Sequence, residues 1–191
     1  MNRTVILSLL LIIGFISCKT SEREINRLEI AKNYYKALNS SDNLKMALLL
    51  TDSLVTKETE YNYVQTFSVE EFMEWLKWDA VFSPTYEILQ MEQKDTIVKA
   101  KISKIDKRIS FLHQVPIVTN DKIISIETTE YIVFNDSTFV KNRDNIVSWI
   151  DENHPELNGF LHDQTETGGL KYLKAIELYK NKNNVQQNHN Y

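Results

Sequence analysis

The sequence predicts one α+β domain in which helices pack on one face of a curved antiparallel sheet. Apolar residues recur at helical spacing up to about residue 80, alternate with a period of two between residues 86 and 134, and return to helical spacing beyond residue 144. Helices followed by a run of strands gather on one side of the sheet. With 191 residues, of which 42% are hydrophobic and 25% charged, the chain is long enough for a sizeable core.

Three helices are expected at the start of the domain, and their ends carry recognisable capping residues. The expected helices span residues 24–38, 43–50 and 69–80. Asp42 can cap the second helix. Ser68 followed three residues later by Glu71 fits a capping box, which predicts the start of the third helix. The segment between the second and third helices is interpreted as a short connection.

Strands are expected next, because apolar and polar residues alternate. They span residues 86–91, 96–105, 108–118 and 122–134, with a possible short strand over 138–141. The first two form a hairpin around Gln93-Lys94-Asp95. In the long last strand, four apolar residues are expected on one face: Ile124, Ile126, Ile132 and Phe134.

The C-terminal part is predicted to be helical. Asp144 is a candidate cap for a helix over 145–152, and a further helix is expected over 170–181 after a polar loop with Gly168-Gly169. We therefore divide the chain into residues 1–17 (signal peptide), 18–24 (tether), 25–141 (α+β domain), 142–182 (helical extension) and 183–191 (flexible tail).

The first eighteen residues have the pattern of a bacterial lipoprotein signal. A short positive segment with Arg3 precedes an apolar run, Val5–Ile16, which is too short to cross a membrane. Phe15-Ile16-Ser17-Cys18 resembles the lipobox. That resemblance implies cleavage before Cys18 and attachment of lipid to its thiol, and several acyl chains would anchor the protein stably.

This leader sets the expected location and partners. We expect the mature chain at a bacterial membrane, with the outer membrane favoured, where it would face the periplasm or the cell surface. The net charge of −4 argues against a nucleic-acid partner, which needs a clustered positive surface. Because Cys18 is the single cysteine, no disulfide framework is expected. No cofactor is expected.

The order of helices and strands resembles the NTF2-like superfamily, which includes SnoaL-like and ketosteroid-isomerase-like proteins. The resemblance is carried by residues 31–38 (Ala-Lys-Asn-Tyr-Tyr-Lys-Ala-Leu), by Asp42 and Leu44, and by the long strand that begins Lys-Ile-Ile-Ser-Ile. It covers about residues 25–141. It implies a cone with a pocket between the helices and the concave sheet. A homodimer through the sheet face is a separate expectation for a partner. No catalytic residue of the family is transferable by alignment.

His113 and Glu130 are the most notable polar pair. Alternation along their strands places each on the apolar side, where a carboxylate is costly unless it is paired. If the two strands are neighbours, the pair could be a buried hydrogen bond, a contact to a ligand, or an acid–base couple. The structural interpretation is favoured.

Aromatic residues suggest a pocket wall. Trp75, Trp78 and Phe82 form a second stripe on the third helix, which indicates either core packing or one side of a cavity. Tyr34 and Tyr35 allow the same two interpretations. The candidate pocket residues are Tyr35, Trp75, Trp78, Phe111, His113, Thr128 and Glu130.

No local motif points to an established chemistry. Residues 151–156 with His162-Asp163 contain metal-ligand types, but their spacing matches no metal site, and no metal is expected. Three hypotheses remain: a module that binds a small apolar ligand or an envelope protein, an isomerase, dehydratase or cyclase that uses the His113–Glu130 pair, and a structural envelope lipoprotein. The first is favoured, and an open pocket would argue against the third.

Overall fold

The computed structural model describes residues 26–108, 110–132 and 134–188. The signal peptide, Cys18 and the tether lie outside the described residues. Within the described part, no helix combines the length and apolar character needed to cross a membrane.

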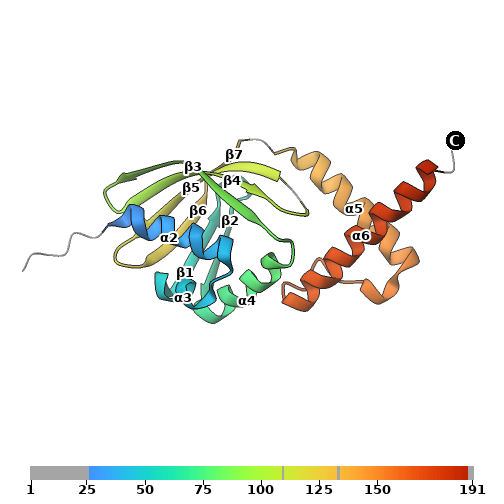
Figure 1. The fold of residues 1–191 in the computed structure, drawn as a ribbon, viewed down its shortest axis with the longest axis horizontal. Helices are drawn as coiled ribbons and strands as arrows, with labels where there is room; N and C mark the ends of the chain where they lie inside the picture. Colours follow the sequence, from blue (N-terminus) through green and yellow to red (C-terminus); the bar gives the residue numbers. More distant parts are fainter. Residues whose placement is uncertain (1–25, 109, 133, 189–191) are drawn as a thin grey trace, which may run out of the picture.

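A seven-stranded sheet forms the frame of the molecule (Figure 1). Its strands are β1 (Leu50–Glu58), β2 (Tyr63–Ser68), β3 (Thr85–Lys94), β4 (Ile97–Ile105), β5 (Ser110–Thr119), β6 (Ile123–Thr128) and β7 (Glu130–Tyr131). The order across the sheet is β2-β1-β6-β5-β4-β3, and β7 pairs with β5. Only the β1–β6 pair is parallel among the described pairs.

Three helices cover the concave face of the sheet: α2 (Arg27–Ser40), α3 (Asn43–Leu49) and α4 (Val69–Ala80). Helix α2 packs on β3, β4 and β5, whereas α4 packs on β1 and β2. The main core lies between these layers and includes fully buried Leu54, Phe72 and Ile102.

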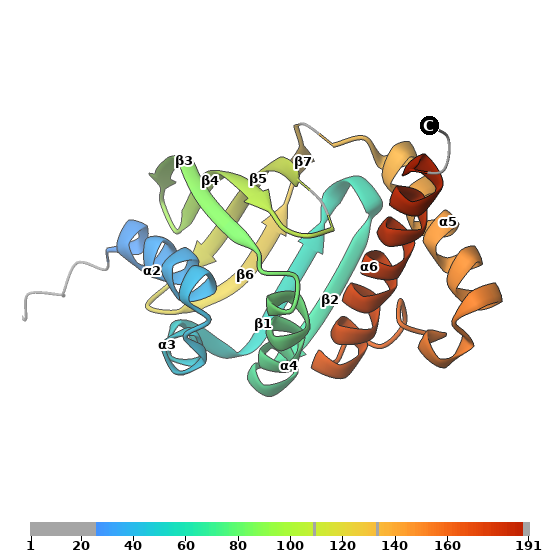
Figure 2. The ribbon, with the colours of Figure 1, turned by 45° about the vertical axis from the view of Figure 1, so that its right-hand side comes forward.

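The C-terminal helices α5 (Asp136–Asn153) and α6 (Glu166–Asn188) form a second layer beside α4 (Figure 2). A short 3-10 turn, η2 (Pro155–Leu157), connects them. A second core lies here, and its buried members include Phe82, Ile150, Phe160 and Tyr172. Gly169 allows α6 to approach α4 closely, since a Cβ at this position would lie 3.0 Å from the carbonyl oxygen of Trp78.

Several sequence predictions of local structure are confirmed. Asp42 caps α3 by accepting a hydrogen bond from the backbone of Lys45. The predicted capping box opens α4, with the Ser68 side chain accepting from Glu71 N and the Glu71 carboxylate accepting from Ser68 N. The hairpin of β3 and β4 turns at Asp95, which adopts a left-handed conformation (φ 55°).

The predicted strand over residues 138–141 and the predicted cap at Asp144 are wrong. Residues 136–153 form one continuous helix, α5, which is capped by Asn135. The side-chain oxygen of Asn135 accepts a hydrogen bond at 2.8 Å from Thr138 N, so the helix begins nine residues earlier than predicted.

The predicted long strand over residues 122–134 is interrupted. It divides at Thr129 into β6 and β7, and the pairing of β5 with β6 shifts register at Ile124. Ile123 is therefore fully buried, whereas Ile124 and Ile132, which were expected to face the core, are exposed. Only Ile126 among the isoleucines named for that face packs against the core.

The segment expected to be a short connection forms β1, η1 (Thr59–Tyr61) and β2. Its apolar alternation is weak, because only Leu50, Leu54 and Phe67 are buried core residues. Beyond Leu54, the inward positions of this hairpin face a cavity and carry polar side chains.

Candidate functional site

A cavity of about 710 Å³ lies between the concave sheet, α4 and the C-terminal helices. All seven strands of the sheet contribute residues. Trp75 and Trp78 line it from α4, and Phe139 and Tyr172 from α5 and α6. This volume is in the range of pockets that hold small organic molecules.

Five of the predicted pocket residues line this cavity: Tyr35, Trp75, Trp78, His113 and Thr128. The side chain of Phe111 lies outside the described part. Glu130 does not line the cavity; it is exposed, and its carboxylate accepts a hydrogen bond at 3.1 Å from Gln114 Nε2.

The predicted His113–Glu130 pair does not form. In the β5–β7 register His113 lies opposite Tyr131, and Glu130 lies opposite Gln114 on the other face of the sheet. The break at Thr129 is the physical reason. Thr128 and Tyr131 both line the cavity although they are three residues apart, so the break inverts the alternation that predicted an inward Glu130.

His113 is buried against the cavity wall, with its ring 6.1 Å from the ring of Tyr131. Burial, and next the positive charge of Lys104, lower the pKa of His113 to about 4. The imidazole is therefore neutral at neutral pH and can act as both a donor and an acceptor.

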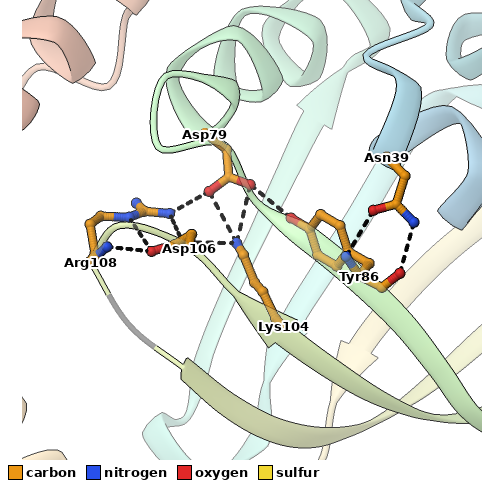
Figure 3. Close-up of polar contacts among 6 residues, drawn as sticks. All are labelled: Asn39, Asp79, Tyr86, Lys104, Asp106 and Arg108. Carbon is orange, nitrogen blue, oxygen red and sulfur yellow. Dashed lines mark hydrogen bonds and ion pairs between the residues drawn. The ribbon is translucent and has the colours of Figure 1, made fainter.

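The inner end of the cavity holds a buried ionic network centred on Asp79 at the end of α4 (Figure 3). Lys104 Nζ donates to both carboxylate oxygens, at 3.0 and 3.1 Å, and the Tyr86 hydroxyl donates to Oδ2 at 2.7 Å. Arg108 also donates to Asp79, and its other carboxylate partner is Asp106, at 2.7 Å. The network therefore pairs two cationic side chains, Lys104 and Arg108, with two carboxylates, Asp79 and Asp106.

The surroundings hold this network in place. The guanidinium carbon of Arg108 lies 3.8 Å from the centre of the Phe82 ring and 4.7 Å from that of Trp78. Asn39, at the end of α2, pairs with both backbone groups of Tyr86, at 2.7 and 2.8 Å. Helices α2 and α4 are thereby tied to β3 beside the network (Figure 3).

The network keeps Asp79 ionised although only 2% of its surface is exposed. Burial alone raises its pKa, but Lys104, Arg108 and the Tyr86 hydroxyl together hold the pKa of Asp79 below its ordinary value. Three side chains already donate hydrogen bonds to the Asp79 carboxylate and occupy most of its acceptor sites. Asp79 is therefore poorly suited to take a proton from a ligand.

The opposite end of the cavity is more exposed, and we call it the mouth: Glu58, Tyr61, Tyr131, Phe134 and Asp136. The Tyr131 hydroxyl donates to Glu58 at 3.4 Å, and the Tyr61 hydroxyl donates to Asp136 at 3.3 Å. Burial raises the pKa of Glu58, against smaller lowering effects from Tyr131 and Lys104.

Sequence reasoning missed the charged residues of both ends. Two of them carried a signal. Asp79 follows Phe72 and Leu76 at helical spacing, which places it on the buried face of α4. Lys104 follows Ile102 by two residues and therefore continues the apolar face of β4. Arg108 and Glu58 carried no comparable signal, because their positions depend on a turn and on an unrecognised strand.

The described residues contain no cluster of three or more metal-ligand side chains. In the acidic segment after α5, His154 Nδ1 lies 3.1 Å from Glu156, and both side chains are at the surface. The structure therefore offers the cavity, rather than this loop, as the place where a ligand could be held.

Comparison with known proteins adds information about the fold. No protein-family model and no curated protein matches the sequence. Among solved structures, the chain is similar to a candidate polyketide cyclase, IdmH, from Streptomyces antibioticus, with a TM-score of 0.50 at 11% identity over 63% of this chain and 99% of that one.

Two further structures are similar at lower scores. One is a candidate ketosteroid isomerase from Kribbella flavida (TM-score 0.49, 9% identity, 56% of this chain and 78% of that one). The other is an NTF2-like protein of unknown function from Cytophaga hutchinsonii (TM-score 0.48, 11% identity, 58% of this chain and 93% of that one). The α+β class predicted from the sequence, with helices packed on one face of a sheet, is confirmed by the element order and sheet topology, and the fold is similar to that of IdmH. The similarity extends to the fold alone.

Proposed function

We propose that this chain is a lipid-anchored protein of the bacterial cell envelope whose cone binds a small, largely apolar molecule without transforming it. The observation that carries this proposal is the cavity of about 710 Å³, walled by aromatic side chains from α4 and the sheet. A purely structural lipoprotein would have no need to keep such a volume open, because empty space forfeits packing contacts.

The chemistry of the inner end supports binding over catalysis. Its two carboxylates and two cations satisfy one another, so no unpaired charge is presented to the ligand there. The envisaged acid–base couple is also broken, because Glu130 lies outside the cavity. His113 remains as a neutral polar contact among apolar and aromatic walls.

The proposed attachment to the membrane is inferred from the N-terminal signal segment. The lipobox-like residues Phe15–Cys18 end a signal-type apolar run, and seven residues separate Cys18 from Asn26, where the described structure begins. A tether of this length would hold the cone close to the membrane surface, since an extended chain advances roughly 3.5 Å per residue. Ligands that partition into or leave the membrane would then be within reach.

Native mass spectrometry of the detergent-extracted protein tests both parts of the proposal. We expect an intact mass for a chain that starts at Cys18 with added acyl groups, and a co-purified small molecule that leaves on activation with its mass unchanged. Incubation of the isolated ligand with fresh protein should return the same molecule.

The matched variants for this experiment are Thr128→Phe and Thr129→Phe. Thr128 lines the cavity, so a phenyl group there should occupy the ligand's space and abolish co-purification. Thr129 is the adjacent residue but does not line the cavity, and its variant should retain the ligand. Equal ligand content in the two variants would rule out the cavity as the binding site, and a chemically altered ligand would favour an enzyme.

A further inference from the structure

Aromatic rings cluster at the mouth of the cavity. The ring centres of Tyr61 and Tyr131 are 5.8 Å apart, and those of Tyr131 and Phe134 are 5.5 Å apart, with interplanar angles of 56° and 42°. All three residues line the cavity. Tilted rings present electron-rich faces in several directions, and such faces attract organic cations.

Carboxylates accompany these rings, and their environment differs from that of the inner end. Among the described residues, neither Glu58 nor Asp136 has a basic group within ion-pairing distance. Arg143 and Lys57 also line the cavity; the Arg143 guanidinium donates to Asp144 at 2.9 and 3.0 Å, and Lys57 lies outside ion-pairing distance of both mouth carboxylates. The mouth is therefore acidic and aromatic, whereas the inner end is internally neutral.

We propose that the molecule bound in the cavity carries an organic cation, a substituted ammonium group, which lies at the mouth against Tyr61, Tyr131 and the carboxylate of Glu58. The apolar body of the same molecule extends inward along Trp75 and Trp78. This inference rests on the proposed function and names the chemical class of the ligand.

The negative charges of the mouth favour a cationic ligand over an anionic or a neutral one. An anionic ligand would be repelled by Glu58 and Asp136. A neutral ligand would displace water from Glu58 without compensating its charge, which is costly for a half-buried carboxylate. The raised pKa of Glu58, caused mainly by burial, reflects that cost, and an adjacent cation would relieve it.

The test uses two probes of the same shape: benzyltrimethylammonium, which is charged, and neopentylbenzene, which is not. Binding to the extracted protein, freed of endogenous ligand, is measured by the change in tryptophan fluorescence, because Trp75 and Trp78 line the cavity. We expect the cation to bind about tenfold more tightly than the neutral probe.

Glu58→Gln keeps the shape of the side chain and removes its charge. It should weaken binding of the cation about tenfold, whereas binding of neopentylbenzene should not weaken, because the uncompensated charge that opposes a neutral ligand is removed. Glu130→Gln is the matched control, since it removes the same charge from the opposite face of the sheet. It should leave both affinities unchanged. Thermal unfolding of each variant verifies that it is folded.

Equal affinity for the two probes, or equal behaviour of the Glu58 and Glu130 variants, would overturn the cation site. If both probes bind equally and Thr128→Phe abolishes both, the proposed ligand-binding function stands although its ligand is not cationic. If neither probe binds, the cation site is refuted, and native mass spectrometry with Thr128→Phe decides the proposed function separately.

Discussion

At the scale of single residues, Asp79 shows how a buried charge is tolerated in this fold. It is the only carboxylate among the described residues that accepts bonds from a lysine, an arginine and a tyrosine together. Lys104, which is 8% exposed, depends on it, because Asp106 lies 3.9 Å from the Lys104 ammonium. Removal of the Asp79 charge would leave a buried cation poorly compensated.

We therefore expect Asp79→Asn to lower the free energy of unfolding by about 3 kcal/mol, measured by urea denaturation. Glu74→Gln on the same helix is the control. Glu74 pairs with Lys77 at the surface, where side-chain exposures are 58% and 41%, and loss of such a pair costs less than about 1 kcal/mol. Similar losses in the two variants would contradict the central role given to Asp79.

His113 gives a prediction for the pH dependence of stability. Its pKa falls from 6.5 to about 4 in the folded state, so between these values the unfolded chain binds the extra proton and the folded chain does not. The free energy of unfolding should therefore fall as the pH is lowered through this window, with a slope approaching about 1.4 kcal/mol per pH unit.

The measurement is urea unfolding of the wild type and of His113→Gln at several pH values between 4 and 6.5. The difference between the two proteins isolates His113 from other titrating groups. Identical pH slopes would mean that His113 has the same pKa in both states. Asp79, with a lowered pKa, acts in a more acidic window and would not produce this slope.

At the scale of elements, helix α4 connects the two cores of the molecule. A continuous aromatic row runs along it from Phe72 through Trp75 and Trp78 to Phe82, with ring centres between 5.3 and 6.2 Å apart. Phe82 then contacts Tyr172 of α6 at 5.4 Å. The close approach of α6 that permits this contact depends on Gly169.

Gly169→Ala should destabilise the protein by about 1 to 2 kcal/mol, although alanine favours helices, because the new methyl group would press on the Trp78 carbonyl. Leu170→Ala is the neighbouring control. Leu170 is 55% exposed, and its truncation should change the stability by less than about 0.5 kcal/mol. Thermal and urea unfolding measure both, and a stabilised Gly169→Ala variant would disprove the tight contact.

At the scale of the whole molecule, the cavity exists because two layers meet around it. The concave sheet and α4 form most of the wall, and Phe139, Arg143 and Tyr172 of the C-terminal helices complete it. The cone and its extension thus share one cavity and one helix, α4. A ligand at this position would contact both parts, so the extension would belong to the proposed binding site.

The sequence by itself determined the features that depend on neighbouring residues. The order of helices and strands, the Asp42 cap, the Ser68–Glu71 capping box and the β3–β4 hairpin follow from local spacing and capping chemistry. The α+β fold class followed from that order. Trp75, Trp78 and His113 were likewise placed by periodicity on surfaces that line the cavity.

Only the tertiary structure decided the features that depend on pairing between distant segments. The break at Thr129 turned Glu130 outward, and the parallel pairing with β6 made β1 a strand although its inward side chains beyond Leu54 are polar. Asp79, Lys104 and Arg108 meet from three separate elements. Periodicity in the sequence indicates which side of a helix or strand is buried. The register between strands and the pairing of charges are fixed by packing between elements, and this register and pairing decide which side chains line the cavity.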